Sequence, residues 1–173
     1  MLSLVIVTTS ASACTKPYDR KRYSYPDRAE LGCKITTYDF YTGKQIPCSL
    51  VDVEHIFPLS KACEMGMSDE NIRKLARDPD NLVFAHQTVN RSKGDALPVQ
   101  TIKRFKNNPS IKFNQANFDD YASRVGVIAD KYNVKRQLGV ANLKLINQAN
   151  RSIRNRIIIQ TTTKVAKRIA TRG

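Results

Sequence analysis

The fold is decided by two stretches of sequence, DVEHIFPLSKA at residues 52–62 and DPDNLVFAHQTVNRSKGD at residues 78–95. The first stretch places the carboxylates of Asp52 and Glu54 immediately before His55. Carboxylate oxygens bind hard divalent cations, and a histidine can accept a proton from water near neutral pH. A strand that ends in this sequence therefore brings a metal ligand and a general base to one place.

The second stretch adds two amide side chains, Asn81 and Asn90, and then a Lys-Gly-Asp sequence that begins at Lys93. An Asn carbonyl can complete the protein share of an octahedral Mg²⁺ site and leave positions for water and phosphate oxygens. In phosphodiester hydrolysis such a cation stabilises the negative charge on the phosphate oxygens, and a base removes a proton from the attacking water. Each residue alone is typical of a turn or a surface, but their order over residues 52–95 is specific.

The surrounding sequence predicts an α+β fold. A β-branched and aromatic run predicts a strand over residues 34–41, which a turn at residues 42–44 joins to a second strand over residues 45–53. Residues 82–84 are expected only as a brief apolar run. Helices are predicted over residues 59–65, 69–77 (with Ser68 as N-cap), 86–93, 99–106, 118–132 and, as one or two helices, 138–170. The apolar stripe of the last region is expected to pack in the core; it consists of Val140, Leu143, Ile146, Ile153, Ile157 and Ile158.

The charge is large and unevenly distributed. The chain has a formal net charge of +14, and residues 99–173 contain 16 Lys and Arg but only three Asp. Residues 1–98 are nearly balanced, with 13 basic and 12 acidic residues. A surplus of this size predicts attraction to a polyanion, either nucleic acid or an acidic membrane surface, although a merely solubilising basic surface would have the same composition. No run reaches 18 apolar residues, so no transmembrane helix is predicted.

The N-terminus and the cysteines indicate an extracytoplasmic location. Residues 1–13 contain a short apolar run followed by Ala-Ser-Ala, which is typical of a signal-peptide end, although a buried N-terminal strand fits the same residues. The four cysteines are Cys14, Cys33, Cys48 and Cys63. An even number without Cys-x-x-Cys spacing favours two disulfides over a structural zinc site. We therefore expect a secreted or extracytoplasmic protein, with an intracellular one as the alternative.

Together these motifs resemble the His-Asn-His (HNH) nucleases, whose ββα-metal fold surrounds one cation with a hairpin and a helix. The two stretches are most similar to the branch with Asp-x-Asp-His and Asn-x-x-Lys-Gly-Asp sequences, which includes many secreted bacterial nucleases. The Tyr41-Thr42-Gly43 turn also matches this branch, and the resemblance covers residues 38–98. It implies a nuclease core over residues 14–98, with residues 99–173 as a basic helical extension packed on it.

The resemblance implies a role for each residue of the motif. His55 would be the general base, and Glu54 and Asn90 would bind the metal. Asp52 would be a second ligand or a carboxylate that supports the ligands, and Asn81 would orient the loop that carries His55. Glu54 stands where the family more often has Asp. Asn at position 90 favours Mg²⁺ or Mn²⁺ over zinc, because an amide oxygen is a hard ligand.

Basic residues would contact the phosphates. Lys93 and Arg91 are candidates both to contact a phosphate and to stabilise the negative charge of the transition state. The further candidates for nucleic-acid binding are Lys103, Arg104, Arg151 and Arg154. His86, which lies four residues before Asn90, could be a third ligand or a phosphate contact, but a structural role is favoured.

The expected function is endonucleolytic hydrolysis of nucleic acid, with DNA favoured over RNA, one Mg²⁺ or Mn²⁺, low sequence specificity, and 5′-phosphate and 3′-hydroxyl products. The main alternative is a non-catalytic nucleic-acid-binding protein, because a basic surface serves both functions. A basic membrane-active protein or toxin is a third interpretation, but it leaves residues 50–95 unexplained.

Overall fold

The computed structural model describes residue 14 and residues 17–170, and over residues 165–170 only the backbone is described. Strands and helices mix in the N-terminal half, and the C-terminal half is helical. The predicted α+β class is therefore confirmed. The signal-peptide interpretation concerns residues 1–13, which lie outside the described residues.

Two antiparallel pairs of strands form the sheets. Strand β1 (Thr36–Tyr38) pairs with β2 (Gln45–Pro47), and β3 (Val51–His55) pairs with β4 (Leu82–His86). The predicted hairpin is confirmed for β1 and β2 alone. A 3₁₀ turn, η2 (Cys48–Leu50), separates β2 from β3, so the predicted continuous strand over residues 45–53 is wrong. The partner of β3 comes from the apolar run at residues 82–84, because pairing between distant segments is not visible in local periodicity.

Asp39 connects the two sheets. Its carboxylate accepts hydrogen bonds from the backbone N–H and the hydroxyl of Thr42, at 2.6 and 2.8 Å, and from the backbone N–H of His86 at 2.6 Å. The turn after β1 is thereby attached to β4. Tyr41 in this turn is fully buried and packs edge-on against Tyr121. The turn is therefore fixed between β4 and the core residue Tyr121.

The helices agree closely with the prediction. In the N-terminal half they are α1 (Leu59–Glu64), α2 (Asp69–Arg77) and α3 (Gln87–Lys93), and the Ser68 hydroxyl accepts the Asn71 N–H at the start of α2. In the C-terminal half they are α4 (Pro98–Lys106), α5 (Gln115–Lys131) and α6 (Gly139–Ala170), so the last region is one helix. None of the described helices combines the length and hydropathy needed to span a bilayer.

One hydrophobic core joins the two halves of the chain. It includes Ile56 and Phe57 after β3, Leu75 of α2, and Phe105 and Tyr121 of α4 and α5. The helical extension therefore shares its core with the N-terminal part. At the centre of the α5–α6 contact, a Cβ added to Gly126 would lie 2.7 Å from Ile146, so only glycine permits this close approach.

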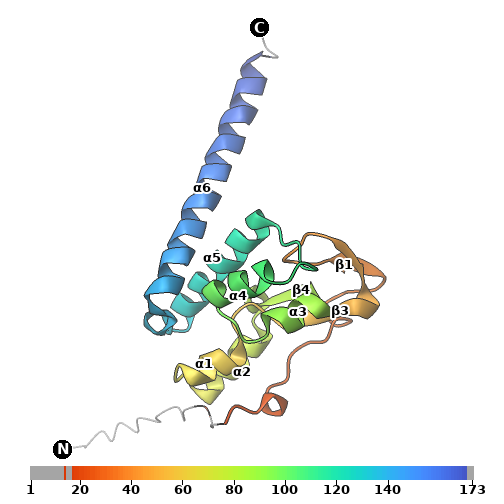
Figure 1. Ribbon diagram of the computed structural model, residues 1–173, viewed down its shortest axis with the longest axis vertical. Helices are drawn as coiled ribbons and strands as arrows, with labels where there is room; N and C mark the ends of the chain where they lie inside the picture. The colour runs from red at the N-terminus through yellow and green to blue at the C-terminus, as the bar shows by residue number, and fades with distance from the viewer. Residues whose placement is uncertain (1–13, 15–16, 171–173) are drawn as a thin grey trace, which may run out of the picture.

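Helix α6 leaves this core along its length. Figure 1 shows its first turns beside α5 and its remaining turns, in blue, extending away from the rest of the molecule. Ile146 and Ala149 are buried, whereas Ile157 and Ile158 are 57% and 61% exposed. The prediction that the whole apolar stripe packs in the core is therefore wrong beyond Ile153, where α6 extends away from the other elements (Figure 1), and also at Val140, which is exposed.

The four cysteines form the two predicted disulfides. Cys14 bonds to Cys63, with 49 residues between their positions, and Cys33 bonds to Cys48, with a separation of 15. Disulfides persist in oxidising compartments, so this pairing is compatible with the expected extracytoplasmic location.

Candidate active site

Strands β3 and β4 and helix α3 bring the two sequence stretches together. His55 ends β3 and pairs with Leu82, which begins β4. Helix α3 follows β4 at once and packs against both strands. Asn90 and Lys93 of α3 thereby return to the residues of β3, from which a long stretch of chain separates them.

His55 is held in a single orientation. Its Nε2 lies 3.0 Å from the carbonyl oxygen of Ala76. A carbonyl only accepts hydrogen bonds, so Nε2 carries the hydrogen and Nδ1 keeps its lone pair. The ring of Tyr25 packs edge-on against the imidazole, with ring centroids 4.7 Å apart. Burial lowers the pKa of His55 to about 4, against the opposing effect of the bond to Ala76. The imidazole is therefore neutral at pH 7, which is the form that a general base requires.

Asn81 ties the chain after His55 to the end of α2. Its side chain is fully buried: Oδ1 accepts the N–H of Phe57 at 2.7 Å, and Nδ2 donates to the carbonyls of Phe57 and Leu75. Leu75 immediately precedes Ala76, whose carbonyl holds His55. Asn81 thus connects the chain just after His55 to the end of α2 that binds the His55 ring. It does not line the cavity beside His55. This is the placement expected of a residue that orients the His55 loop.

Glu54 and Lys93 form a buried ion pair. The Lys93 Nζ lies 2.5 Å from Glu54 Oε1, with 0% and 8% of the two side chains exposed. The ammonium also donates to the carbonyl oxygens of His55 and Gly94. Burial raises the pKa of Glu54, and the charge of Lys93 opposes that rise. The pair therefore fixes the end of β3 against the end of α3.

A small cavity of about 190 Å³ is lined by Glu54, His55 and Asn90 together. The Nδ2 of Asn90 donates to Asp52 Oδ2 at 3.0 Å, which leaves the Asn90 carbonyl oxygen available as a ligand. In the described part of the chain no three His, Cys, Asp or Glu side chains converge as a ligand group. The carboxylate and amide groups that line this cavity are Glu54 (paired with Lys93), Asn90, and Asp95 (paired with Lys61 and Arg104). Glu54 and Asn90 could bind a hard cation there with water as the remaining ligands, a pattern that Mg²⁺ accepts. Asp52 supports Asn90 from a neighbouring cavity.

The predicted phosphate-binding residues fall into two groups. Lys93 is fully buried, so the predicted phosphate contact is wrong for its ammonium as placed. Arg104 donates to the carbonyl of Lys93 and pairs with Asp95 at 3.6 Å, so it caps α3. The other four are exposed and have no carboxylate partner among the described residues; they are Arg91, Lys103, Arg151 and Arg154.

His86 has the structural role that was favoured. It is the N-cap of α3, and its Nδ1 accepts the N–H of Thr88 at 3.1 Å. It does not line the cavity of His55.

Sequence reasoning missed one wall of the cavity. Tyr18, Arg20 and Tyr25 line it together with residues of β3 and α3, and all three lie before residue 34, where no strand, helix or site residue is predicted from the sequence. Their alternation of aromatic and basic side chains, close to two cysteines, is the one signal that could have pointed to them.

Comparison of the chain with protein-family models, with curated proteins and with solved structures finds no match.

Proposed function

We propose that this protein is a metal-dependent endonuclease of the His-Asn-His type, which hydrolyses phosphodiester bonds of nucleic acid, with DNA as the favoured substrate. One observation carries the proposal. A neutral histidine, with its Nδ1 lone pair unused among the described residues, lines the same cavity as a buried carboxylate and an amide with an available carbonyl oxygen.

Each residue has a distinct part in the proposed reaction. His55 would accept the proton of the attacking water at Nδ1, while Ala76 holds the opposite side of the ring. Glu54 and Asn90 would hold the divalent cation, which when bound supplies a Lewis acid for the charge on the phosphate oxygens. Lys93 opposes the rise that burial causes in the pKa of Glu54 and holds its carboxylate in place, and Asn81 holds the chain after His55.

The basic surface supplies affinity in this proposal. Residues 99–173 contain most of the positive charge, and Arg151 and Arg154 are exposed residues of α6. Contacts of this kind go to the phosphate backbone, which favours low sequence specificity and strongly salt-dependent binding.

A plasmid-nicking assay tests the proposal. Wild type should nick supercoiled DNA with Mg²⁺ or Mn²⁺ and lose this activity in EDTA. We expect His55→Ala to lower the rate by about 10²–10⁴-fold, since a general base contributes about this much. His86→Ala is the matched control: it removes the other histidine, which caps α3 outside the cavity, and should leave cleavage nearly intact.

Two outcomes would overturn the proposal. Cleavage by purified His55→Ala at the wild-type rate would rule out His55 as the base. DNA retained in a gel shift without any cleavage, with either metal, would instead support the non-catalytic nucleic-acid-binding protein.

A further inference from the structure

A covalently fixed segment crosses the candidate site; we call residues 17–28 the strap. Cys14, just before the strap, is bonded to Cys63 in α1, the helix that follows His55. Cys33, just after the strap, is bonded to Cys48 in η2, the turn that precedes β3. The two disulfides therefore anchor the strap on both sides of the strand that ends in His55.

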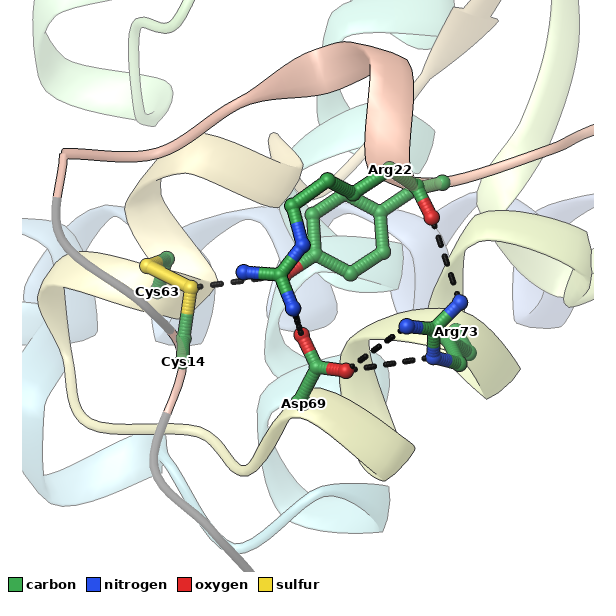
Figure 2. Close-up of a disulfide and its surroundings, with 6 residues drawn as sticks. Cys14, Arg22, Cys63, Asp69 and Arg73 are labelled. Carbon is green, nitrogen blue, oxygen red and sulfur yellow. Dashed lines mark hydrogen bonds and ion pairs between the residues drawn. A yellow bond between two sulfur atoms is a disulfide. The ribbon is translucent and has the colours of Figure 1, made fainter.

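The middle of the strap is attached to α2. The Tyr23 hydroxyl donates to Asp69 Oδ1 at 2.6 Å, and Arg22 forms an ion pair with the same carboxylate at 3.7 Å. Arg73 donates to the backbone carbonyl of Arg22 at 3.2 Å and to Asp69 Oδ2 at 2.9 Å. Figure 2 shows this cluster beside the Cys14–Cys63 disulfide. These contacts hold the neighbouring Arg20 at a defined place.

Arg20 faces the candidate site. It lines the cavity of His55, and its guanidinium carbon lies 5.2 Å from the centroid of the Tyr25 ring, which in turn packs against His55. Arg20 and Tyr25 also line the neighbouring cavity of about 530 Å³ that contains Asp52. The two cavities therefore share Arg20 in their linings, and a strand of nucleic acid that occupied both would pass it.

The acidic residues of the cavity are paired with other cations, so Arg20 is available to bind a ligand. The acidic residues that line the His55 cavity are Glu54, paired with Lys93, and Asp95, paired with Lys61 and Arg104. Arg20 is exposed and has no ion pair with any residue that the structure describes. A cation that lines a cavity and has no acidic partner is suited to an anion.

We propose that Arg20 binds the scissile phosphate of the substrate. This inference rests on the proposed nuclease function and supplies the phosphate contact that the buried Lys93 does not make. A guanidinium presents a planar fork of N–H donors that matches two phosphate oxygens. The strap, held between two disulfides, keeps this fork beside the proposed base.

A small phosphodiester separates this contact from general affinity for DNA. We expect Arg20→Ala to lower kcat/KM roughly 10- to 100-fold for both plasmid DNA and bis(p-nitrophenyl) phosphate, which corresponds to the loss of a charge-assisted hydrogen bond. Arg20→Lys should recover part of this loss. Lys21→Ala is the matched control, because Lys21 is exposed on the same strap but lines neither cavity; it should leave hydrolysis of the small substrate within about two-fold of wild type. Thermal melting checks that each variant is folded.

The failures of the two proposals are distinguishable. If wild type is active and Arg20→Ala hydrolyses bis(p-nitrophenyl) phosphate at the wild-type kcat/KM, the assignment of Arg20 is wrong and the nuclease proposal stands. If wild type cleaves neither substrate, the nuclease proposal fails, and DNA affinity in EDTA then tests Arg20 alone. Equal affinities of Arg20→Ala and Lys21→Ala would overturn the assignment, whereas weaker binding by Arg20→Ala would support a contact between Arg20 and a backbone phosphate.

Discussion

The β3–β4–α3 unit and helix α6 use charge in opposite ways. In the unit, Glu54 and Lys93 are buried together at 2.5 Å, and the polar side-chain atoms of Asn81 each make a hydrogen bond inside the protein. In α6, Arg151 and Arg154 are exposed, and the chain from residue 131 onward contains eleven Lys and Arg and no Asp or Glu. A buried pair is costly to disturb and therefore holds atoms in place, whereas exposed charges act at long range and are screened by salt.

The comparison predicts its largest effect at Lys93. Lys93→Met should lower the free energy of unfolding by about 3–5 kcal/mol, because it leaves the Glu54 carboxylate buried without its partner. Urea unfolding at pH 7 with the disulfides intact would measure this. Lys103→Met is the control: this lysine of α4 is exposed, and its loss should change stability by less than about 0.5 kcal/mol. If both substitutions changed the free energy of unfolding equally, burial of Lys93 would not make its charge more important for stability than that of Lys103.

A second effect, of about 3 kcal/mol, concerns His55 and pH. The pKa of His55 is about 4 in the folded protein, against an ordinary value of 6.5, because burial disfavours the charged ring. Between these values the unfolded chain binds more protons, so the contribution of His55 is fully present above pH 6.5 and is lost as the pH falls toward 4. In EDTA, wild type should therefore lose about 3 kcal/mol more stability than His55→Asn between pH 7 and pH 4. If the unfolding free energies of the two proteins had the same pH dependence, burial would not lower the pKa of His55.

The smallest effect is expected on α6. Replacing both Arg151 and Arg154 by Ala should leave stability unchanged and make the slope of log affinity against log salt shallower by about 2, as each lost phosphate contact changes it by about 0.9. Fluorescence anisotropy with a DNA duplex between about 50 and 200 mM salt would measure the slope. Arg156→Ala removes one charge from the same helix, but it should also lower stability, because Arg156 pairs with the buried Asp119 at 2.8 Å. An unchanged slope in the double variant would place the DNA elsewhere.

Much of the local structure could be predicted from the sequence. The Ser68 cap begins α2, and Gly94, with a φ of +54°, ends α3, because both signals act through the neighbouring backbone alone. The motif also selected His55, Glu54, Asn81 and Asn90. In the structure three of them line one cavity, and Asn81 bonds to the chain just after His55.

Three features could not be predicted. The strand partner of His55 lies in residues 82–86, the Lys93 ammonium is buried against Glu54, and the strap brings Arg20 and Tyr25 to the same cavity. Each depends on which distant segments meet, and the local pattern of residues does not determine which cysteines bond to each other or which strands pair.

The sequence by itself determined the α+β class, the helix limits and the chemical types at the site, because caps, glycines and hydrophobic periodicity act over one or two turns of chain. Only the tertiary structure decided which charges are buried and which are exposed. Lys93 and Arg20 are both basic residues near the same histidine, yet packing of α3 buries the first and the path of the strap leaves the second facing the cavity. Burial is a property of surfaces that meet across the chain, so it separates a structural cation from one that can bind substrate.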